Sequence, residues 1–157
     1  MSDARSYPAR PYLAASAAIV RDGKILVVRR ARPPAHGLFT LPGGVVETGE
    51  TLTQAVTREV SEETGLTIEP VALAGFRETI VRDAQTRVER HFVILCFAAR
   101  WRAGEAVLNE ELSEARWIDP AELADLSTTP GLAEIVAAAF DRLAEAGDTQ
   151  MASRRLV

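Results

Sequence analysis

Three carboxylates lie within five residues of one another near the middle of the chain. They are Glu59, Glu62 and Glu63, and Arg58 directly precedes them. Carboxylate oxygens are hard donors of the kind that Mg²⁺ and Mn²⁺ prefer. Mg²⁺ is commonly bound by a few carboxylates together with substrate phosphates. The cluster therefore indicates a Mg²⁺ site for a phosphorylated ligand, with Mn²⁺ as a possible substitute.

The acidic cluster falls in a segment that is predicted to be helical from Leu52 to Thr64. No Pro or Gly interrupts this segment. Thr51 is a suitable N-cap, and Gly65 stands where a left-handed residue closes a helix. Apolar residues at helical spacing make one inward stripe: Leu52, Ala55, Val56 and Val60. Residues three and four apart share one side of a helix, so the three glutamates gather there.

Two explanations are open for this acidic face. Like charges at this spacing repel by about 0.2–0.5 kcal/mol per pair, and a bound cation would relieve the repulsion. Alternatively, the face is simply exposed and solvated. The preceding residues bear on the choice, because Leu41-Pro42-Gly43-Gly44 is a Gly-rich turn that leads to the helix. Glycines let the backbone turn tightly and approach a ligand closely.

The stretch from Gly44 to Leu66 reads GVVETGETLTQAVTREVSEETGL. It resembles the signature of the Nudix hydrolases, which is G, five residues, E, seven residues, R-E, an apolar residue, any residue, E-E, any residue, G and an apolar residue. Every specified position is filled here: Gly44, Glu50, Arg58, Glu59, Val60, Glu62, Glu63, Gly65 and Leu66. A late Trp117 followed by Asp119-Pro120 resembles the family more weakly.

The resemblance implies roles for individual residues. Four residues are expected to supply metal ligands: Gly43 through its carbonyl, and Glu59, Glu62 and Glu63. Glu62 is a further ligand or a proton acceptor, and Arg58 is expected to orient the carboxylates. Glu50 is expected to contact Arg58 or to lie in the outer metal shell.

Related enzymes often supply another carboxylate from the loop before the late Trp. Glu111 is the best match and the candidate general base, and Glu110 and Glu114 are close alternatives. A solvated acidic loop would explain all three residues equally well.

Three residues are candidates for substrate contacts: Arg30, Phe39 and Gly44. In related enzymes a basic residue at the position of Arg30 often contacts substrate phosphate, whereas an exposed arginine at a strand edge is the alternative. Phe39 either stacks on a nucleobase or covers the core.

A pyrophosphate will not approach clustered glutamates unless metal ions invert the local field. Bound Mg²⁺ can neutralise phosphoryl oxygens and lower the pKa of an attacking water. The prediction is therefore a Mg²⁺-dependent hydrolase of a nucleoside diphosphate linked to another moiety. The resemblance favours ADP-ribose, and the alternative is a nucleotide-pool enzyme that converts a (d)NTP to (d)NMP and pyrophosphate. Nucleotide sugars, dinucleotides and capped RNA stay open. A sensor without hydrolysis is disfavoured because every motif glutamate is kept.

The composition of the chain indicates which binding partners and which cellular location to expect. The chain has 157 residues, a formal net charge of −4 and a single cysteine. An acidic chain does not predict a nucleic-acid partner, and no run is long enough to cross a membrane. Cys96 lies in an apolar run and is expected to be a buried thiol rather than a nucleophile, which fits a cytoplasmic protein. The expected partner is a small nucleotide, and a homodimer is possible because related enzymes are often dimers.

The apolar pattern predicts an α/β protein. Strands are predicted at Tyr12–Val20, Ile25–Arg30, Thr67–Phe76, Val88–Trp101 and Ala115–Ile118, with further helices from Asp119 to Leu126 and from Leu132 onward. The segment Arg77–Glu89 is polar and charged, and a turn is predicted at Asp83-Ala84-Gln85. The elements imply an α/β/α sandwich with a central mixed sheet, as the resemblance also does. Residues 1–11 are expected to be a loose arm, 12–147 a single Nudix domain and 148–157 a C-terminal tail.

Overall fold

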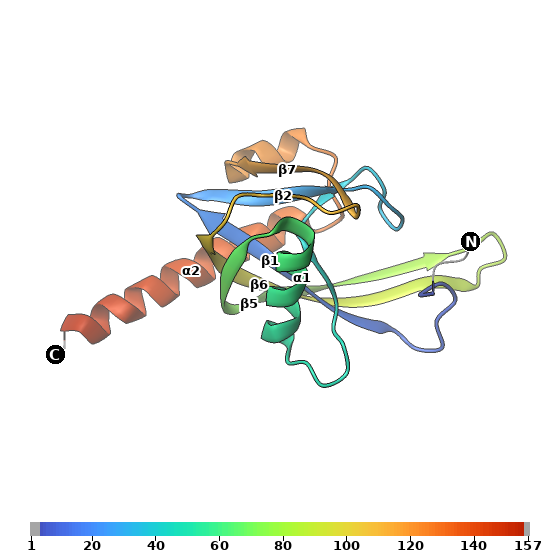
Figure 1. Cartoon of the computed structure of the whole chain (residues 1–157), viewed down its shortest axis with the longest axis horizontal. Helices are drawn as coiled ribbons and strands as arrows, with labels where there is room; N and C mark the ends of the chain where they lie inside the picture. Colours follow the sequence, from blue (N-terminus) through green and yellow to red (C-terminus); the bar gives the residue numbers. More distant parts are fainter. Residues whose placement is uncertain (1–3, 156–157) are drawn as a thin grey trace.

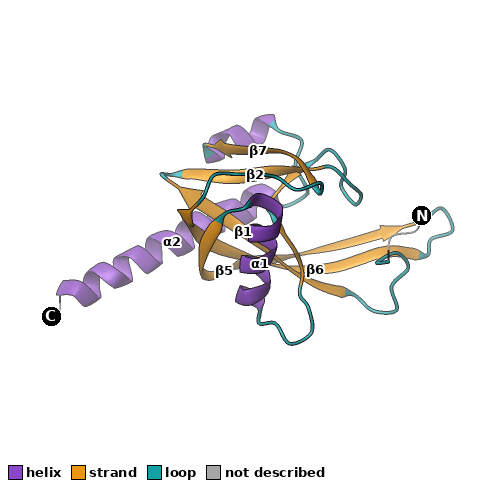
Figure 2. Ribbon diagram, viewed as in Figure 1, coloured by secondary structure: helices purple, strands orange, loops and turns teal. Residues whose placement is uncertain are grey.

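The computed structural model describes residues 4–155, with side chains to residue 147. Seven strands form one sheet, and helices lie on both of its faces (Figures 1 and 2). The strands are β1 (Tyr12–Arg21), β2 (Lys24–Arg30), β3 (Phe39–Thr40), β4 (Gly43–Val45), β5 (Thr67–Arg82), β6 (Val88–Ala103) and β7 (Leu112–Ile118). The helices are α1 (Leu52–Thr64), the 3-10 helix η1 (Pro120–Asp125) and α2 (Leu132–Arg155).

The sheet is mixed, as predicted. Its main order is β3-β2-β1-β6-β5, with β4 paired to β1 and β7 paired to β2. β1 runs parallel to β6, and the other pairings are antiparallel. β1 is central and its middle is buried on both faces, which explains its nearly continuous run of small apolar residues.

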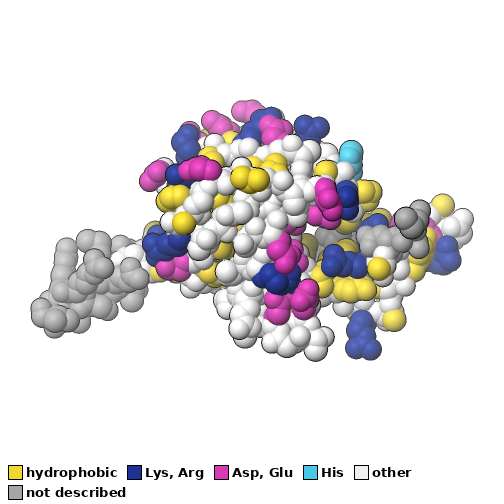
Figure 3. Space-filling view, in the orientation of Figure 1, with side chains coloured by type: hydrophobic (Ala, Val, Ile, Leu, Met, Phe, Trp, Pro, Cys, Tyr) yellow, Lys and Arg dark blue, Asp and Glu magenta, His cyan; other side chains and the backbone are white. Residues whose placement is uncertain are grey.

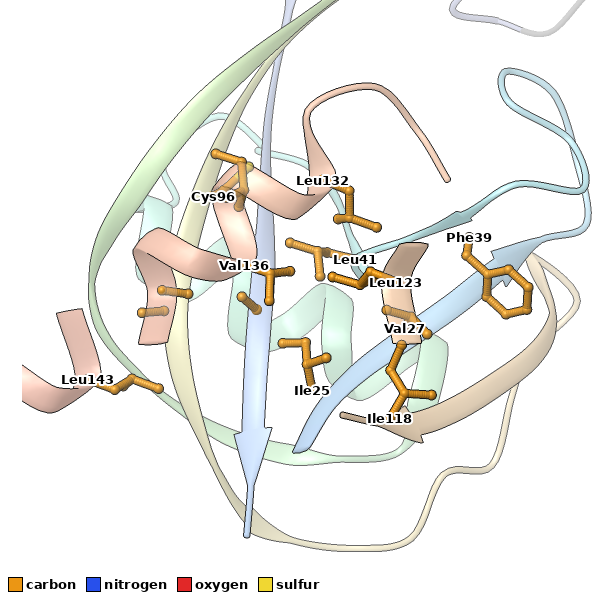
Figure 4. Packing of buried hydrophobic residues seen from close by; sticks show 14 residues of the cluster. Ile25, Val27, Phe39, Leu41, Cys96, Ile118, Leu123, Leu132, Val136 and Leu143 are labelled. Carbon is orange, nitrogen blue, oxygen red and sulfur yellow. The ribbon is translucent and has the colours of Figure 1, made fainter. Parts of the chain in front are cut away.

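Two hydrophobic clusters lie on opposite faces of the sheet. On one face, Val56 and Val60 of α1 pack with Ile19 and Leu26. On the other face, α2 contributes residues such as Val136 to a cluster that contains Cys96 (Figure 4). Two helical layers around one sheet confirm the α/β/α sandwich, and Cys96 is a buried thiol as expected.

α1 has the predicted bounds because its signals are local. The hydroxyl of Thr51 accepts a hydrogen bond from the N–H of Gln54 at 3.1 Å, and the Gln54 side chain accepts from the N–H of Thr51 at 2.9 Å. Gly65 has φ of 71° and donates its N–H to the carbonyl of Ser61. Both ends of the helix are therefore capped, which holds the glutamates in a defined register.

The strand predicted to end at Phe76 is longer than expected, because β5 continues to Arg82 and pairs with β6. The turn predicted at Asp83-Ala84-Gln85 is confirmed, and the N–H of Thr86 donates to the carbonyl of Asp83 there at 2.9 Å. The two strand ends project from the body as an arm, defined here as residues 76–95 (Figure 1). Charged residues on the exposed side of β5 are the reason why its continuation was not predicted. Two strands of two or three residues, β3 and β4, were not predicted, and the helix after Asp119 is 3-10 rather than α.

The two ends of the chain contact or extend the sandwich. The N-terminal segment, residues 1–11, was expected to be loose. Here the N–H of Tyr7 donates to the carbonyl of Glu89 at 2.8 Å, and the Tyr7 hydroxyl donates to Asp83 at 2.9 Å. α2 continues to Arg155, so the expected tail at residues 148–157 begins within this helix, and its side chains lie outside the described part. No described helix is long and apolar enough to span a membrane.

Candidate active site

Arg58 connects α1 to the segment that precedes it. Its guanidinium donates five hydrogen bonds, which use all of its N–H groups. Two go to Glu50, from Nε at 2.7 Å and from Nη2 at 2.9 Å. Nη1 donates to Glu59 at 3.0 Å and Glu62 at 3.2 Å, and Nη2 donates to the carbonyl of Val45 at 3.1 Å. The two bonds from Arg58 and a bond from the N–H of Glu47 lower the pKa of Glu50 to about 2. The bond to Val45 ties α1 to β4.

Two adjacent glycines bring the backbone directly against the carboxylates of α1. A Cβ atom at Gly44 would lie 2.3 Å from the carboxyl carbon of Glu59. A Cβ atom at Gly43 would lie 2.2 Å from the carbonyl oxygen of Ala15 on β1. The N–H of Gly43 donates to Oε2 of Glu63 at 3.2 Å. The Gly-rich turn therefore allows β4 to fit between β1 and the acidic face of the helix.

Glu59 and Glu63 are carboxylates in a poorly hydrated position. Glu63 is only 7% exposed. The pKa of Glu63 is raised to about 7, mainly by burial. The N–H of Gly43 opposes this rise by favouring the ionised form, and the charge of Glu59 adds to it. Burial also raises the pKa of Glu59, against the opposing effect of Arg58. Glu62 differs, because 57% of its side chain is exposed. The two buried carboxylates would therefore gain from a cation placed beside them.

The loop before β7 is anchored to the end of α1. The N–H of Asn109 donates to the carbonyl of Glu63 at 3.1 Å, and the N–H of Val107 donates to the carbonyl of Thr64 at 2.9 Å. The charge of Glu111 contributes to the raised pKa of Glu63, so the loop brings these two carboxylates into electrostatic contact.

The other two acidic candidates from this part of the chain differ from Glu111. Glu114 pairs with Arg116 at 2.5 Å, and this contact lowers its pKa. Glu110 forms a long ion pair with Arg32 at 3.9 Å, and 78% of its side chain is exposed. Among these three carboxylates, Glu111 is the one whose charge acts on Glu63.

Two arginines border the site. Arg30 ends β2, and its Nε donates to the carbonyl of Pro34 at 2.6 Å. Burial lowers the pKa of Arg30, while the charges of Glu63 and Glu111 raise it, which places this arginine on the site side of the strand. Arg32 forms an ion pair with Glu111 at 3.2 Å. Arg32 was not predicted from the sequence, because its partner lies 79 positions away and no local pattern links them.

The NUDIX domain family model matches residues 11–139 of this chain. The chain belongs to the Nudix hydrolase family. A relative named ADP-ribose pyrophosphatase, from Methanocaldococcus jannaschii, is 37% identical over 109 residues, which cover 69% of this chain and 62% of that protein's length. A MutT-like protein from Streptomyces ambofaciens is 32% identical over 123 residues, covering 78% of this chain and 73% of that protein. The crystal structure of a MutT protein from Methanosarcina mazei Go1 matches with a TM-score of 0.67 and 27% identity, covering 86% of this chain and 96% of that one.

The structure brings most of the Nudix signature residues together with three residues from outside it, Gly43, Arg30 and Glu111. The assembled set comprises Gly43, Gly44, Glu50, Arg58, Glu59, Glu62, Glu63, Arg30 and Glu111. Figure 3 shows acidic side chains on both sides of a basic one over α1. Within the described residues, no group of three or more His, Cys, Asp or Glu side chains is already arranged as a metal cage.

The donor chemistry nevertheless fits a divalent ion. Mg²⁺ is usually bound by one or two protein carboxylates and completes its shell with water and substrate phosphate. Glu59 and Glu63 are two such carboxylates, and their burial beside each other makes their ionised forms costly without a cation. Glu62 is held by Arg58 at 3.2 Å and would have to turn to reach the same ion.

Phe39 lies elsewhere. It is 6% exposed and belongs to the cluster on the α2 face, with Leu41 and Leu123 (Figure 4). The guanidinium of Arg116 lies 5.0 Å from the centre of its ring. A ring covered in this way cannot stack on a nucleobase, so of the two expectations for Phe39 the core position is the observed one.

Proposed function

We propose that this Nudix chain is a Mg²⁺-dependent hydrolase that cleaves the pyrophosphate of a nucleoside diphosphate linked to another moiety. One observation carries the proposal: Glu63, with a pKa raised to about 7, is buried beside Glu59 at the Gly-rich turn. Because the ionised forms of these two carboxylates are costly without a nearby positive charge, the site favours a bound cation. The cation in turn attracts a phosphate anion.

The residues around the proposed metal have distinct tasks. Glu59 and Glu63, with the carbonyl of Gly43, hold Mg²⁺, and Mn²⁺ can take its place. When bound, the metal neutralises phosphoryl oxygens and acidifies a water molecule. Arg58 fixes the direction of the carboxylates through its five hydrogen bonds, and Glu62 is a further ligand or a proton acceptor.

Two residues outside the signature act on substrate and water. Glu111 takes the proton from the attacking water as general base, because it is the loop carboxylate whose charge reaches Glu63. Arg30 binds a substrate phosphate, since its positive charge is half buried at the site. Gly44 lets the backbone lie directly against the carboxylate of Glu59, and its N–H and carbonyl are the groups of this turn that would contact the substrate.

ADP-ribose is the favoured substrate, with AMP and ribose 5-phosphate as products. The supporting observation is the 37% identity to a relative named ADP-ribose pyrophosphatase. The MutT-like relative at 32% identity supports the second candidate, hydrolysis of a (d)NTP to (d)NMP and pyrophosphate. We also propose a cytoplasmic location, a homodimer and no nucleic-acid partner; the lone buried thiol and the acidic composition support the first and last of these.

The test is product analysis after incubation with ADP-ribose and Mg²⁺. Formation of AMP and ribose 5-phosphate, abolished by EDTA and by Glu63→Gln, is the expected result. Glu110→Gln is the matched control, because Glu110 is an exposed loop carboxylate. Absence of product from ADP-ribose, nucleotide sugars, dinucleotides and a panel of nucleoside triphosphates would refute the proposed hydrolysis. Product from triphosphates alone would replace the favoured substrate by the second candidate.

A further inference from the structure

One edge of β5 has no neighbouring strand in the described part of the chain, because β5 ends the sheet order. The first half of this strand carries features that block pairing. Pro70 has no N–H to donate, and Val71 and Ala74 are extra residues without partners in β6. Proline and bulges are common protections of sheet edges against other strands.

The second half of β5 has neither protection. It pairs with β6 without interruption from Gly75 to Val81, and the extra residue near its end, Glu89, belongs to β6 rather than to β5. This half forms the arm that projects from the helical layers (Figure 1). A regular, exposed strand edge is a ready template for pairing with another strand.

The arm also presents exposed apolar side chains. Phe76 is 62% exposed and Ile80 is 47% exposed. Because strand side chains alternate, these residues share one face with Glu78 and Arg82, which are also exposed. Glu78 makes no side-chain hydrogen bond or ion pair with the residues that the structure describes, and Arg82 donates to the carbonyl of Thr86 at the end of its own hairpin.

Two opposite charges flank Ile80 at equal distances along this face. Glu78 lies two residues before it and Arg82 two residues after it. In an antiparallel pair of two identical strands centred on Ile80, each Glu78 would face Arg82 of the other strand. We propose that the second half of β5 is a homodimer interface, in which this edge pairs antiparallel with the same edge of a second copy.

The charge pattern selects a second copy over an unrelated strand. A two-fold interface must be self-complementary, because each residue meets its counterpart from the other subunit. The segment from Glu78 to Arg82 meets this condition in the antiparallel direction alone, since a parallel pair in register would place like charges together. Pairing also places the two Ile80 side chains against each other and joins two sheets into one. The inference concerns assembly and does not depend on the proposed hydrolysis.

Sedimentation velocity over a range of protein concentrations tests the interface through charge reversal. The wild-type chain is expected to form a dimer, and Glu78→Arg and Arg82→Glu are each expected to weaken it roughly tenfold or more, because each places two like-charge pairs across the interface. The double variant Glu78→Arg/Arg82→Glu restores the pairing and the dimer. Lys24→Glu, an exposed charge reversal on β2, is the control and leaves the dimer unchanged. A wild-type monomer at every concentration, or a dimer that tolerates both single reversals, would overturn the proposal.

A cysteine at the centre of the interface gives an independent measurement. Directly opposed residues in an antiparallel pair have Cα atoms about 4.5–5.5 Å apart, within the range of about 4.4–6.8 Å that a disulfide spans. Ile80→Cys is therefore expected to form a covalent dimer on mild oxidation, whereas Gln85→Cys in the exposed turn is not. Cys96 is the sole native cysteine and is buried, so it does not interfere. Equal cross-linking of both variants would contradict the proposed register.

Discussion

Ionisation of Glu63 is expected to destabilise the metal-free protein, and Glu63→Gln is expected to remove this cost. Burial is the main cause that raises the pKa of Glu63 from 4.5 to about 7. Each unit of pKa corresponds to about 1.4 kcal/mol. The ionised fold is therefore less stable than the fold with protonated Glu63 by roughly 3 kcal/mol.

The sign of the pH dependence follows from proton uptake. Between pH 4.5 and about 7, the folded state holds a proton on Glu63 that the unfolded state has released. The stability from this group is thus complete below pH 4.5 and is lost as the pH rises through about 7. Gln does not titrate, and its amide oxygen can still accept the hydrogen bond from Gly43. The quantity to compare at two pH values is the gain in the free energy of unfolding that Glu63→Gln brings over the wild type. This gain should therefore be larger at pH 8 than at pH 5 by about 2–3 kcal/mol.

Urea denaturation in EDTA at pH 5, 6, 7 and 8, followed by tryptophan fluorescence, measures this difference. Glu110→Gln serves as the control, because it makes the same carboxyl-to-amide change at a side chain that is 78% exposed. Adding Mg²⁺ at pH 8 should stabilise the wild type and not Glu63→Gln. A difference between Glu63→Gln and wild type that stays constant from pH 5 to pH 8 would refute the account of this buried carboxylate.

Three further substitutions probe other parts of the site. Gly44→Ala should displace Glu59, since its Cβ would lie 2.3 Å from the carboxyl carbon, and kcat should fall about 100-fold with the circular dichroism spectrum unchanged. Arg58→Lys cannot reproduce five directed hydrogen bonds, so urea denaturation should show a loss of about 2 kcal/mol together with weaker Mg²⁺ binding by calorimetry; wild-type values would contradict its orienting role. Glu111→Gln should lower kcat by roughly 100-fold or more, whereas Glu110→Gln should leave it unchanged, and the reverse order would move the general base to Glu110.

The motif helix could be predicted closely because its determinants are close in sequence. Thr51 and Gln54 cap its start, Gly65 closes its end, and nothing between them disrupts the helix. The contact between Arg58 and Glu50 was also expected from the signature, and the structure places it at 2.7 Å. Local capping and helical spacing were sufficient to gather these side chains.

Features that depend on distant parts of the chain were harder to predict. Glu111 reaches the site because Asn109 binds the end of α1, and no local pattern contains that contact. Phe39 could face either a ligand or the core, because both environments suit an aromatic ring. The first strand of the arm was predicted to end at Phe76 because the residues that follow, such as Glu78 and Arg82, are charged, although their alternation with less exposed residues is a strand pattern.

The parallel pairing of β1 with β6 has a consequence for the order in which this protein can assemble. Every pair in this ladder joins residues 80 positions apart, as in Tyr12 and Phe92. During synthesis, the helix that carries the glutamates leaves the ribosome before β6 does, so its inner face at first has only part of its sheet to pack against. Contacts between such distant residues form late in folding. The carboxylates of Glu59 and Glu63 should therefore be hydrated in the nascent chain, and the pair should acquire its raised proton affinity only after β6 is in place.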